Sequence, residues 1–303
     1  MKKWEDNIRK VVPYVPGEQP NEPEMIKLNT NENPYPPAPG VQRALEAMDA
    51  GCLRLYPDPG AHELREELAR YYGFGWTRFC GSGVGRRAGH VLFDVFDSSA
   101  PILFPDITYS FYDVWADLFR IPYQRPMLDE RFHIRKEDYF RENGGIIFPN
   151  PNAPTGVEMP LEEVEEIVRR NPDVIVIVDE AYIDFGAASA LPLIAKYENL
   201  IVVQTFSKSR SMAGMRIGYA MGNPVLIKYL NDVKYSFNSY TMNQTALRLG
   251  TEAVKDERYF RDTLGRIIET REWTKEGLRR LGFRFEDSKA NFIFAAHESC
   301  PAE

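Results

Sequence analysis

The sequence predicts an α/β fold, with a large domain built on a mainly parallel sheet covered by helices and a smaller, incomplete α+β domain. Short apolar runs rich in β-branched residues recur through the middle of the chain. Several are apolar at consecutive positions, as in strands that are buried on both faces. Helical patterns lie between several of these runs. Strands that alternate with helices are typical of a mainly parallel sheet.

The chain divides into three predicted parts. Residues 1–60 are rich in Pro and Asn, which predicts an N-terminal arm and the start of a small domain. Residues 61–250 carry the alternating pattern and would form the large domain. Residues 251–303 continue a stretch of long helices that begins near residue 223 and end in strand-like sequence. We expect them to begin a C-terminal small domain that is incomplete.

The spacing of apolar residues predicts the individual elements. Residues 61–72 place Leu64, Leu68 and Tyr71 at helical spacing, and residues 161–170 form a second amphipathic helix. Five apolar runs have the length of strands: 101–106, 145–150, 174–182, 199–208 and 216–222.

Composition and charge exclude several classes of protein. With 44% hydrophobic and 27% charged residues, the chain has the composition of an ordinary soluble globular protein. Its formal net charge of -7 argues against a nucleic-acid-binding surface. The N-terminal sequence does not fit a signal peptide and no apolar run reaches membrane-spanning length, so we expect a cytoplasmic protein. Three cysteines and four histidines show neither disulfide nor metal-ligand spacing, so we expect no metal.

Polar residues follow three neighbouring runs of the predicted sheet. Asp179 ends the stretch 174–179 and Tyr182 comes shortly after it, Lys208 follows the stretch 201–207, and the turn "NPNAPTG" follows residues 145–149. Open parallel sheets bind ligands at the carboxyl ends of their strands, so these three loops should open onto one crevice. A buried acid at a strand end is often structural, but a lysine at the end of the next strand favours a functional pair.

A lysine, a buried acid and a phosphate-binding set together indicate pyridoxal phosphate. The lysine amine can form a Schiff base with the aldehyde, and an acid paired with the pyridinium nitrogen keeps the ring an electron sink. Ser207 and Arg216, with backbone amides, can hold the dianionic phosphate, because hydroxyl and charge-assisted donors satisfy its oxygens.

Five motifs resemble those of histidinol-phosphate aminotransferases, class II aminotransferases of the pyridoxal-phosphate-dependent aspartate-aminotransferase fold family (fold type I). They are "KLNTNENPY", "FPDITYSFY", "NPNAPTG", "VDEAYIDF" and "SKSRSMAGMRIG". The resemblance covers nearly the whole chain, and the order and spacing of the motifs are specific to that group. The resemblance implies a homodimer of histidine biosynthesis that moves an amino group from a small-molecule donor to a keto-acid acceptor.

The resemblance also implies roles around the cofactor ring. Lys208 would be the Schiff-base residue and proton shuttle, and Asp179 would be the partner of the pyridinium nitrogen. Tyr182 would hydrogen-bond the phenolic oxygen of the ring, and Tyr109 would stack on the ring.

Other residues would contact the phosphate and the substrate. Ser207 and Arg216 would hold the phosphate, while Tyr56 would reach the phosphate of the neighbouring subunit, so that the site would need a dimer. Asn31, Glu32 and Asn33 in the N-terminal arm could cover the substrate. Tyrosines are common packing residues and Asn-Pro is an ordinary turn, so packing roles stay open for Tyr56, Tyr109 and Asn33.

The sequence departs from the family's pattern in three places. Ala153 stands where the family has an asparagine that touches the phenolic oxygen, so either Tyr182 would hold that oxygen unaided or Asn152 would shift in. The family's final segment, whose arginines bind the carboxylate and phosphate of the substrate, is missing, and we expect an incomplete substrate half-site.

The third departure lies at residues 80–96, where the family has a glycine-rich turn and an acidic helix start that cradles the phosphate. Two arginines stand there instead, which would form either a cationic phosphate clamp or a solvated loop. We favour a third interpretation. Residues 85–92 can be encoded so that the same bases, shifted by one, read Asp-Asp-Glu-Leu-Ala-Met-Cys, which is close to the family. Residues from about 75 to about 95 would then be an out-of-frame translation.

Three functions are compatible with this pattern. The first is transamination between histidinol phosphate and 2-oxoglutarate. The second is a related phospho-amino-acid decarboxylase, which shares the lysine, the aspartate and the phosphate residues. The third is a catalytically impaired fragment of an aminotransferase, because the phosphate turn is altered and the C-terminal arginines are missing.

Overall fold

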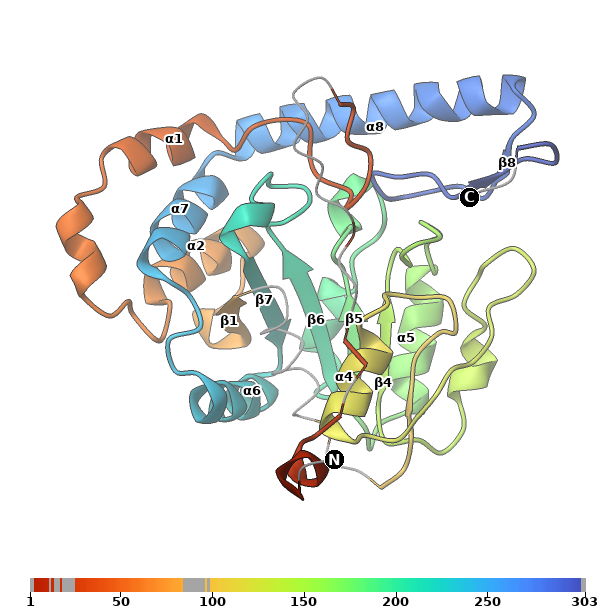
Figure 1. Cartoon of the computed structure of the whole chain (residues 1–303), viewed down its shortest axis with the longest axis horizontal. Coiled ribbons are helices and arrows are strands. Elements are labelled where there is room, and N and C mark those ends of the chain that lie inside the picture. The colour runs from red at the N-terminus through yellow and green to blue at the C-terminus, as the bar shows by residue number, and fades with distance from the viewer. Residues whose placement is uncertain are drawn as a thin grey trace.

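A seven-stranded sheet lies at the centre of the computed structural model, which describes residues 3–10, 12–13, 17, 25–83, 96 and 99–300 (Figure 1). The strand order is β1-β7-β6-β5-β4-β2-β3. The strands are β1 (Phe79–Gly83), β2 (Ile102–Leu103), β3 (Tyr123–Gln124), β4 (Ile146–Pro149), β5 (Val176–Asp179), β6 (Leu200–Thr205) and β7 (Ile217–Gly222). The five strands from β6 to β3 pair in parallel, and β7 is antiparallel to both of its neighbours.

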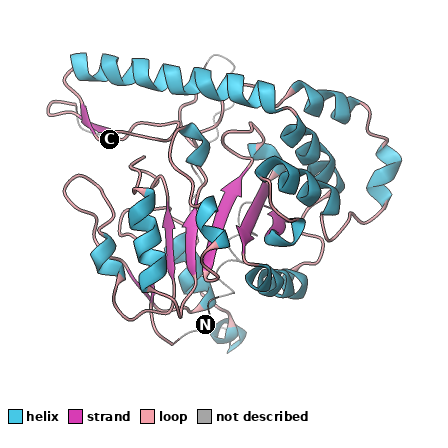
Figure 2. Cartoon of the chain, turned by 180° about the vertical axis from the view of Figure 1, so that it is seen from behind, coloured by secondary structure: helices cyan, strands magenta, loops and turns pink. Residues whose placement is uncertain are grey.

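Helices cover both faces of this sheet, as Figures 1 and 2 show from opposite sides. The α-helices are α1 (Pro39–Glu46), α2 (His62–Tyr72), α4 (Tyr112–Phe119), α5 (Leu161–Arg170), α6 (Pro224–Phe237), α7 (Gln244–Lys255) and α8 (Glu257–Arg280). Short 3-10 helices are η1 (Lys3–Asn7), η2 (Ala50–Arg54), η3 (Trp76–Arg78), η4 (Lys136–Tyr139), η5 (Ile183–Phe185), η6 (Leu191–Ala195) and η7 (Ala213–Met215).

The alternation of side chains along each strand divides the core into two layers. Val176 and Val178 of β5 pack with the apolar residues of α2, α5 and α7 on one face. Ile177, the residue between them, packs with those of α4 and α6 on the other face. Successive side chains of a strand point to opposite faces, so a run that is apolar at every position needs helices on both sides. The buried strands therefore hold their carboxyl ends in fixed positions.

The long helix α8 runs along the top of Figure 1. It leads to a two-stranded antiparallel sheet of β8 (Arg284–Phe285) and β9 (Ala295–Ala296). The buried guanidinium of Arg271 in α8 donates hydrogen bonds to the carbonyl oxygens of Phe185 (2.7 Å) and Ala290 (3.0 Å). This arginine thus ties α8 both to the loop after β5 and to the segment before β9.

The α/β class and the mainly parallel sheet are confirmed, and each of the five predicted runs contains a strand that is shorter than the run. The run at 101–106 forms a strand only at Ile102–Leu103, and 174–182 only at Val176–Asp179, because the flanking residues turn away into loops. The strand β1 was missed, since Phe79–Gly83 has neither an apolar run nor an alternating pattern. Domain boundaries at residues 60 and 250 stay a prediction. Among the described residues, no helix is long and apolar enough to span a membrane.

Candidate active site

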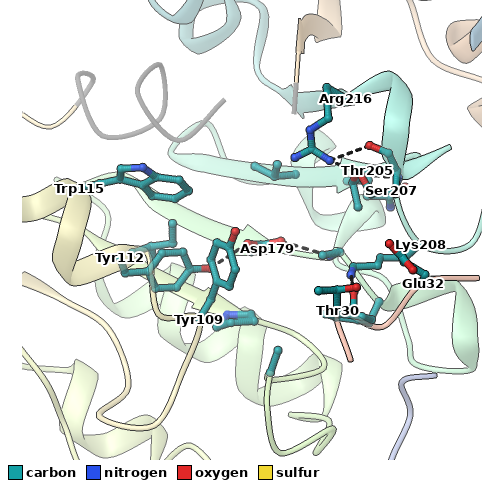
Figure 3. Close-up of a pocket in the computed structure, with 18 of the residues that line it drawn as sticks. Thr30, Glu32, Tyr109, Tyr112, Trp115, Asp179, Thr205, Ser207, Lys208 and Arg216 are labelled. Atoms are coloured by element: carbon teal, nitrogen blue, oxygen red, sulfur yellow. Dashed lines mark hydrogen bonds between the residues drawn. The ribbon is translucent and has the colours of Figure 1, made fainter. Parts of the chain in front are cut away.

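A cavity of about 440 Å³ opens at the carboxyl ends of β4, β5 and β6 (Figure 3). Six of the predicted site residues line it: Tyr109, Asp179, Tyr182, Ser207, Lys208 and Arg216. Thr30 and Glu32 of the N-terminal arm also line it. The three loops predicted to open onto one crevice therefore meet in this cavity.

Asp179, the last residue of β5, presents a carboxylate at the base of the cavity. Its Oδ2 accepts a hydrogen bond from the Tyr112 hydroxyl (2.8 Å), and its Oδ1 accepts one from the backbone N–H of Ala181 (3.1 Å). Burial raises the pKa of Asp179, although both hydrogen bonds oppose this shift. A buried carboxylate is costly unless an opposite charge lies nearby, so this position favours a cationic ligand group.

Lys208 follows β6 and points into the same cavity. Its Nζ donates a hydrogen bond to the carbonyl oxygen of Thr30 (2.7 Å) and lies 3.4 Å from that of Asn31. Burial lowers the pKa of Lys208 to about 8, with a smaller lowering from Arg216 and an opposing effect of the Glu32 carboxylate. An amine with this pKa is partly neutral near physiological pH, which a nucleophile or a base requires.

We expect this pKa to be measurable in the free protein. Lys208 should react with an amine-acylating reagent with a midpoint near pH 8, because only the neutral amine is nucleophilic. Exposed Lys228, whose pKa is raised by its hydrogen bond to Asp232, should react only at higher pH. Peptide mass spectrometry across a pH series measures both residues in one sample. A Lys208 midpoint equal to that of Lys228 would contradict the depressed pKa.

Arg216 and Ser207 lie side by side near Lys208 (Figure 3). Arg216 adopts a left-handed backbone conformation (φ 57°) at the start of β7. Its Nη1 lies 3.5 Å from the Oγ of Ser207, which is buried, and donates to the carbonyl oxygen of Ala213 (2.8 Å). No carboxylate pairs with Arg216 among the residues whose positions are described. A guanidinium beside a hydroxyl is a suitable site for an anionic group.

Two tyrosines complete the lining. Tyr109 is 38% exposed, and its ring packs edge-on against Tyr112 and Trp115. Tyr182 is buried, and its hydroxyl accepts a hydrogen bond from the side-chain amide of Asn31 (3.1 Å). Burial raises the pKa of Tyr182 to about 12, so its hydroxyl keeps its proton at physiological pH.

Three predicted residues do not line the cavity. Asn152 is buried, and its amide donates to the carbonyl oxygen of Ile107 (2.9 Å), which shapes the loop. Asn33 donates to the carbonyl oxygens of Lys208 (3.0 Å) and Ser209, so in this structure it holds the backbone that carries the lysine. Tyr56 is 81% exposed and stacks on Tyr240.

Neither Tyr112 nor the carbonyl oxygens of the arm were predicted from the sequence. Tyr112 is the first residue of α4, and Tyr109 lies in the turn before that helix, so helical spacing does not relate the two side chains. The backbone contacts of Thr30 depend on the path of the arm, and no residue type signals them. In the altered segment 80–96, residues 84–95 lie outside the described part of the chain. The clamp, loop and out-of-frame interpretations therefore stay predictions.

The chain is similar to characterised aminotransferases over almost all of its length. Residues 23–299 match the family described as aminotransferase class I and II. Over 295 residues the chain is 48% identical to histidinol-phosphate aminotransferase 1 of Pseudomonas aeruginosa, covering 97% of this chain and 84% of the relative. It is also 48% identical over 300 residues to the histidinol-phosphate aminotransferase of Lactococcus lactis subsp. cremoris, covering 99% and 84%.

Solved structures share the fold at lower identity. The histidinol-phosphate aminotransferase of Sinorhizobium meliloti, in complex with pyridoxal-5'-phosphate, is 23% identical with a TM-score of 0.80, covering 88% of this chain and 74% of that one. The enzyme of Clostridium acetobutylicum is 23% identical with a TM-score of 0.79, covering 89% and 83%. Given the family match and the relatives at 48% identity, the chain belongs to the class I and II aminotransferases and, within them, to the family of histidinol-phosphate aminotransferases.

Proposed function

We propose that this chain exchanges an amino group between histidinol phosphate and 2-oxoglutarate, with pyridoxal phosphate bound in the cavity between Asp179 and Lys208. One observation carries the proposal: a buried carboxylate and an amine of lowered pKa line the same cavity. The relatives that are 48% identical are named for histidinol phosphate, which we take as the amino donor. The proposed enzyme is a cytoplasmic homodimer. Tyr56, which is 81% exposed, would contact the cofactor phosphate bound by the second copy.

The residues present fit pyridoxal phosphate. The cavity of about 440 Å³ is within the range of small-molecule sites. The Asp179 carboxylate suits the protonated pyridine nitrogen, because each charge lowers the cost of burying the other. Ser207 and Arg216 would donate to the phosphate, the Tyr182 hydroxyl would donate to the ring oxygen, and the Tyr109 ring would lie against the cofactor ring.

The chemistry divides between the cofactor and the chain. When bound, pyridoxal phosphate supplies an aldehyde that condenses with amines and a ring that withdraws electrons. Lys208 would hold the aldehyde before substrate arrives, and its neutral amine would then take the proton from the substrate carbon that bears the amino group. Lys208 would then deliver that proton to the carbon that carried the aldehyde oxygen, and addition of water would release the ketone and leave the amino group behind. The same steps in reverse would pass that amino group to 2-oxoglutarate, which becomes glutamate. The low pKa of Lys208 suits both roles, because a general base works best when its pKa lies near the operating pH.

Product analysis separates this function from its alternatives. The purified chain, loaded with pyridoxal phosphate, should convert histidinol phosphate to the corresponding ketone only when 2-oxoglutarate is present, with glutamate formed in equal amount. A phospho-amino-acid decarboxylase would instead release carbon dioxide from its substrate without a keto acid. A catalytically impaired fragment would form neither product, and either of these results would contradict the proposal.

A further inference from the structure

Asn31, in the N-terminal arm, contacts three side chains from separate parts of the fold. Its side-chain amide donates to the hydroxyl of Tyr182 (3.1 Å), which follows β5. Its carbonyl oxygen lies 3.4 Å from the Nζ of Lys208 and accepts a hydrogen bond from the amide of Asn291 (3.1 Å), which precedes β9. Thr30, the residue before it, accepts the shorter hydrogen bond from Lys208 (2.7 Å).

The backbone of this turn adopts an unfavourable conformation. Thr30 (φ 62°) and Asn31 (φ 52°) are consecutive left-handed residues, and a β-branched threonine rarely adopts this conformation. Such strain persists only where the surroundings hold it, and it is common at functional sites. Here it directs two neighbouring carbonyl oxygens toward the lysine amine, while the Asn31 side chain reaches the tyrosine.

The hydrogen bond from Asn31 determines what the Tyr182 hydroxyl can do. A phenol oxygen that accepts a hydrogen bond on one side still has its own hydrogen to donate on another. Burial keeps that hydrogen in place by raising the pKa of Tyr182 to about 12. Tyr182 lines the cavity, so a ligand oxygen bound there can receive the hydrogen.

No nearby amide of the turn after β4 substitutes for Asn31 among the described residues. Ala153 lines the cavity and packs beside Tyr182, but its methyl group neither donates nor accepts. The amide of Asn152 is engaged by the carbonyl oxygen of Ile107 (2.9 Å), and its Oδ1 by the hydroxyl of Thr108 (3.1 Å).

We propose that Asn31 is a positioning residue that acts through Tyr182. Its amide fixes the phenol so that the hydroxyl donates to the ring oxygen of the cofactor. The carbonyl oxygens of Thr30 and Asn31 hold the Lys208 amine when that amine is not joined to the cofactor. This inference rests on the proposed function, because it needs pyridoxal phosphate in the cavity. It assigns a residue of the arm to the tuning of the cofactor rather than to a cover over the substrate.

The pH dependence of the visible absorption band tests this role without measuring turnover. A hydrogen bond to the ring oxygen stabilises the negative charge on that oxygen. Losing the bond therefore raises the pKa of the bound cofactor, which then loses a proton at higher pH. Asn31→Gly keeps the left-handed backbone and the carbonyl oxygen but deletes the amide. We expect the pH at the midpoint of the absorption change of the loaded variant to rise by on the order of half a unit, because one hydrogen bond is weakened.

A double-mutant cycle separates positioning from a general effect on structure. In a Tyr182→Phe background, Asn31→Gly should no longer move the midpoint, because the group through which it acts is absent. Arg120→Gly is the matched control: it also leaves a glycine at a left-handed position (φ 61°), but Arg120 lies at the end of α4 and is not among the residues that line the cavity. Its midpoint should equal that of the wild type. Asn31→Asp, which tolerates the same backbone but donates no hydrogen bond, should also raise the midpoint if the glycine variant folds poorly.

The outcomes distinguish this inference from the function on which it rests. If the wild-type protein forms the band and neither Asn31 variant changes its pH midpoint, the role of Asn31 is overturned and the function is left intact. An equal shift with and without the Tyr182 hydroxyl would also overturn it, because Asn31 would then act by another route. A wild-type protein that forms no band with pyridoxal phosphate would contradict both the function and this inference.

Discussion

Lys208→Ala should reduce transamination by about 10⁴-fold, because it removes both the amine that would hold the aldehyde and the base that moves the proton. It should also abolish the visible absorption band that forms between the wild-type protein and pyridoxal phosphate. Turnover with histidinol phosphate and the absorption spectrum measure the two effects on one sample. An unchanged band in the variant would contradict the assignment of Lys208.

The fold should survive this substitution. Burial lowers the pKa of Lys208 from 10.5 to about 8, so the folded chain binds this proton more weakly than the unfolded chain does. The charged amine therefore costs stability below pH 8, and that cost fades as the pH rises from about 8 toward 10.5. At neutral pH the variant should unfold at no lower temperature than the wild type. Lys228→Ala is the matched control, because Lys228 is exposed, pairs with Asp232 and does not line the cavity, and it should keep full activity.

Asp179→Asn should reduce kcat by roughly 10²–10³-fold, the usual effect of removing one electrostatic group from an active site. The substitution keeps the size of the side chain and removes the charge that would pair with the pyridine nitrogen. Lys208 is unchanged, so the visible band should still form. Steady-state kinetics and the absorption spectrum together separate lost catalysis from lost binding. Near-normal turnover would rule out the proposed role of the carboxylate.

A matched control lies before the same strand. Asp173 is exposed and precedes β5 at the end opposite the cavity, so Asp173→Asn changes an equal charge without changing the site. It should leave kcat unchanged. A loss in Asp173→Asn as large as that in Asp179→Asn would mean that the effect comes from the charge of the protein rather than from the site.

The ends of the buried strands could be located from the sequence. Asp179 and Lys208 follow continuous apolar runs, and a parallel sheet brings the carboxyl ends of such runs to one edge. The cavity confirms this, since both residues line it. The identity of the chemistry also followed from local sequence, because a lysine, an acid and a serine-arginine pair at these strand ends match few known cofactors.

Contacts between distant segments could not be predicted in the same way. Tyr112 reaches Asp179 because α4 packs on the sheet at that place, and Asn31 reaches Tyr182 because the arm crosses the cavity. Asn152 was predicted to face the cofactor, yet its amide is bound to the carbonyl oxygen of Ile107, a contact set by the turn rather than by the residue type. Local spacing identifies which face of an element is buried, and the packing of elements decides which side chains meet.

Transfer of a labelled amino nitrogen tests the central claim most directly. Histidinol phosphate that carries an isotopic label on its amino nitrogen is incubated with the purified chain, pyridoxal phosphate and 2-oxoglutarate, and the glutamate formed is analysed by mass spectrometry. The account predicts that the label appears in glutamate in an amount equal to the ketone produced, and that Lys208→Ala transfers none within the same time. Unlabelled glutamate, or label transferred equally well by the Lys208→Ala variant, would contradict it.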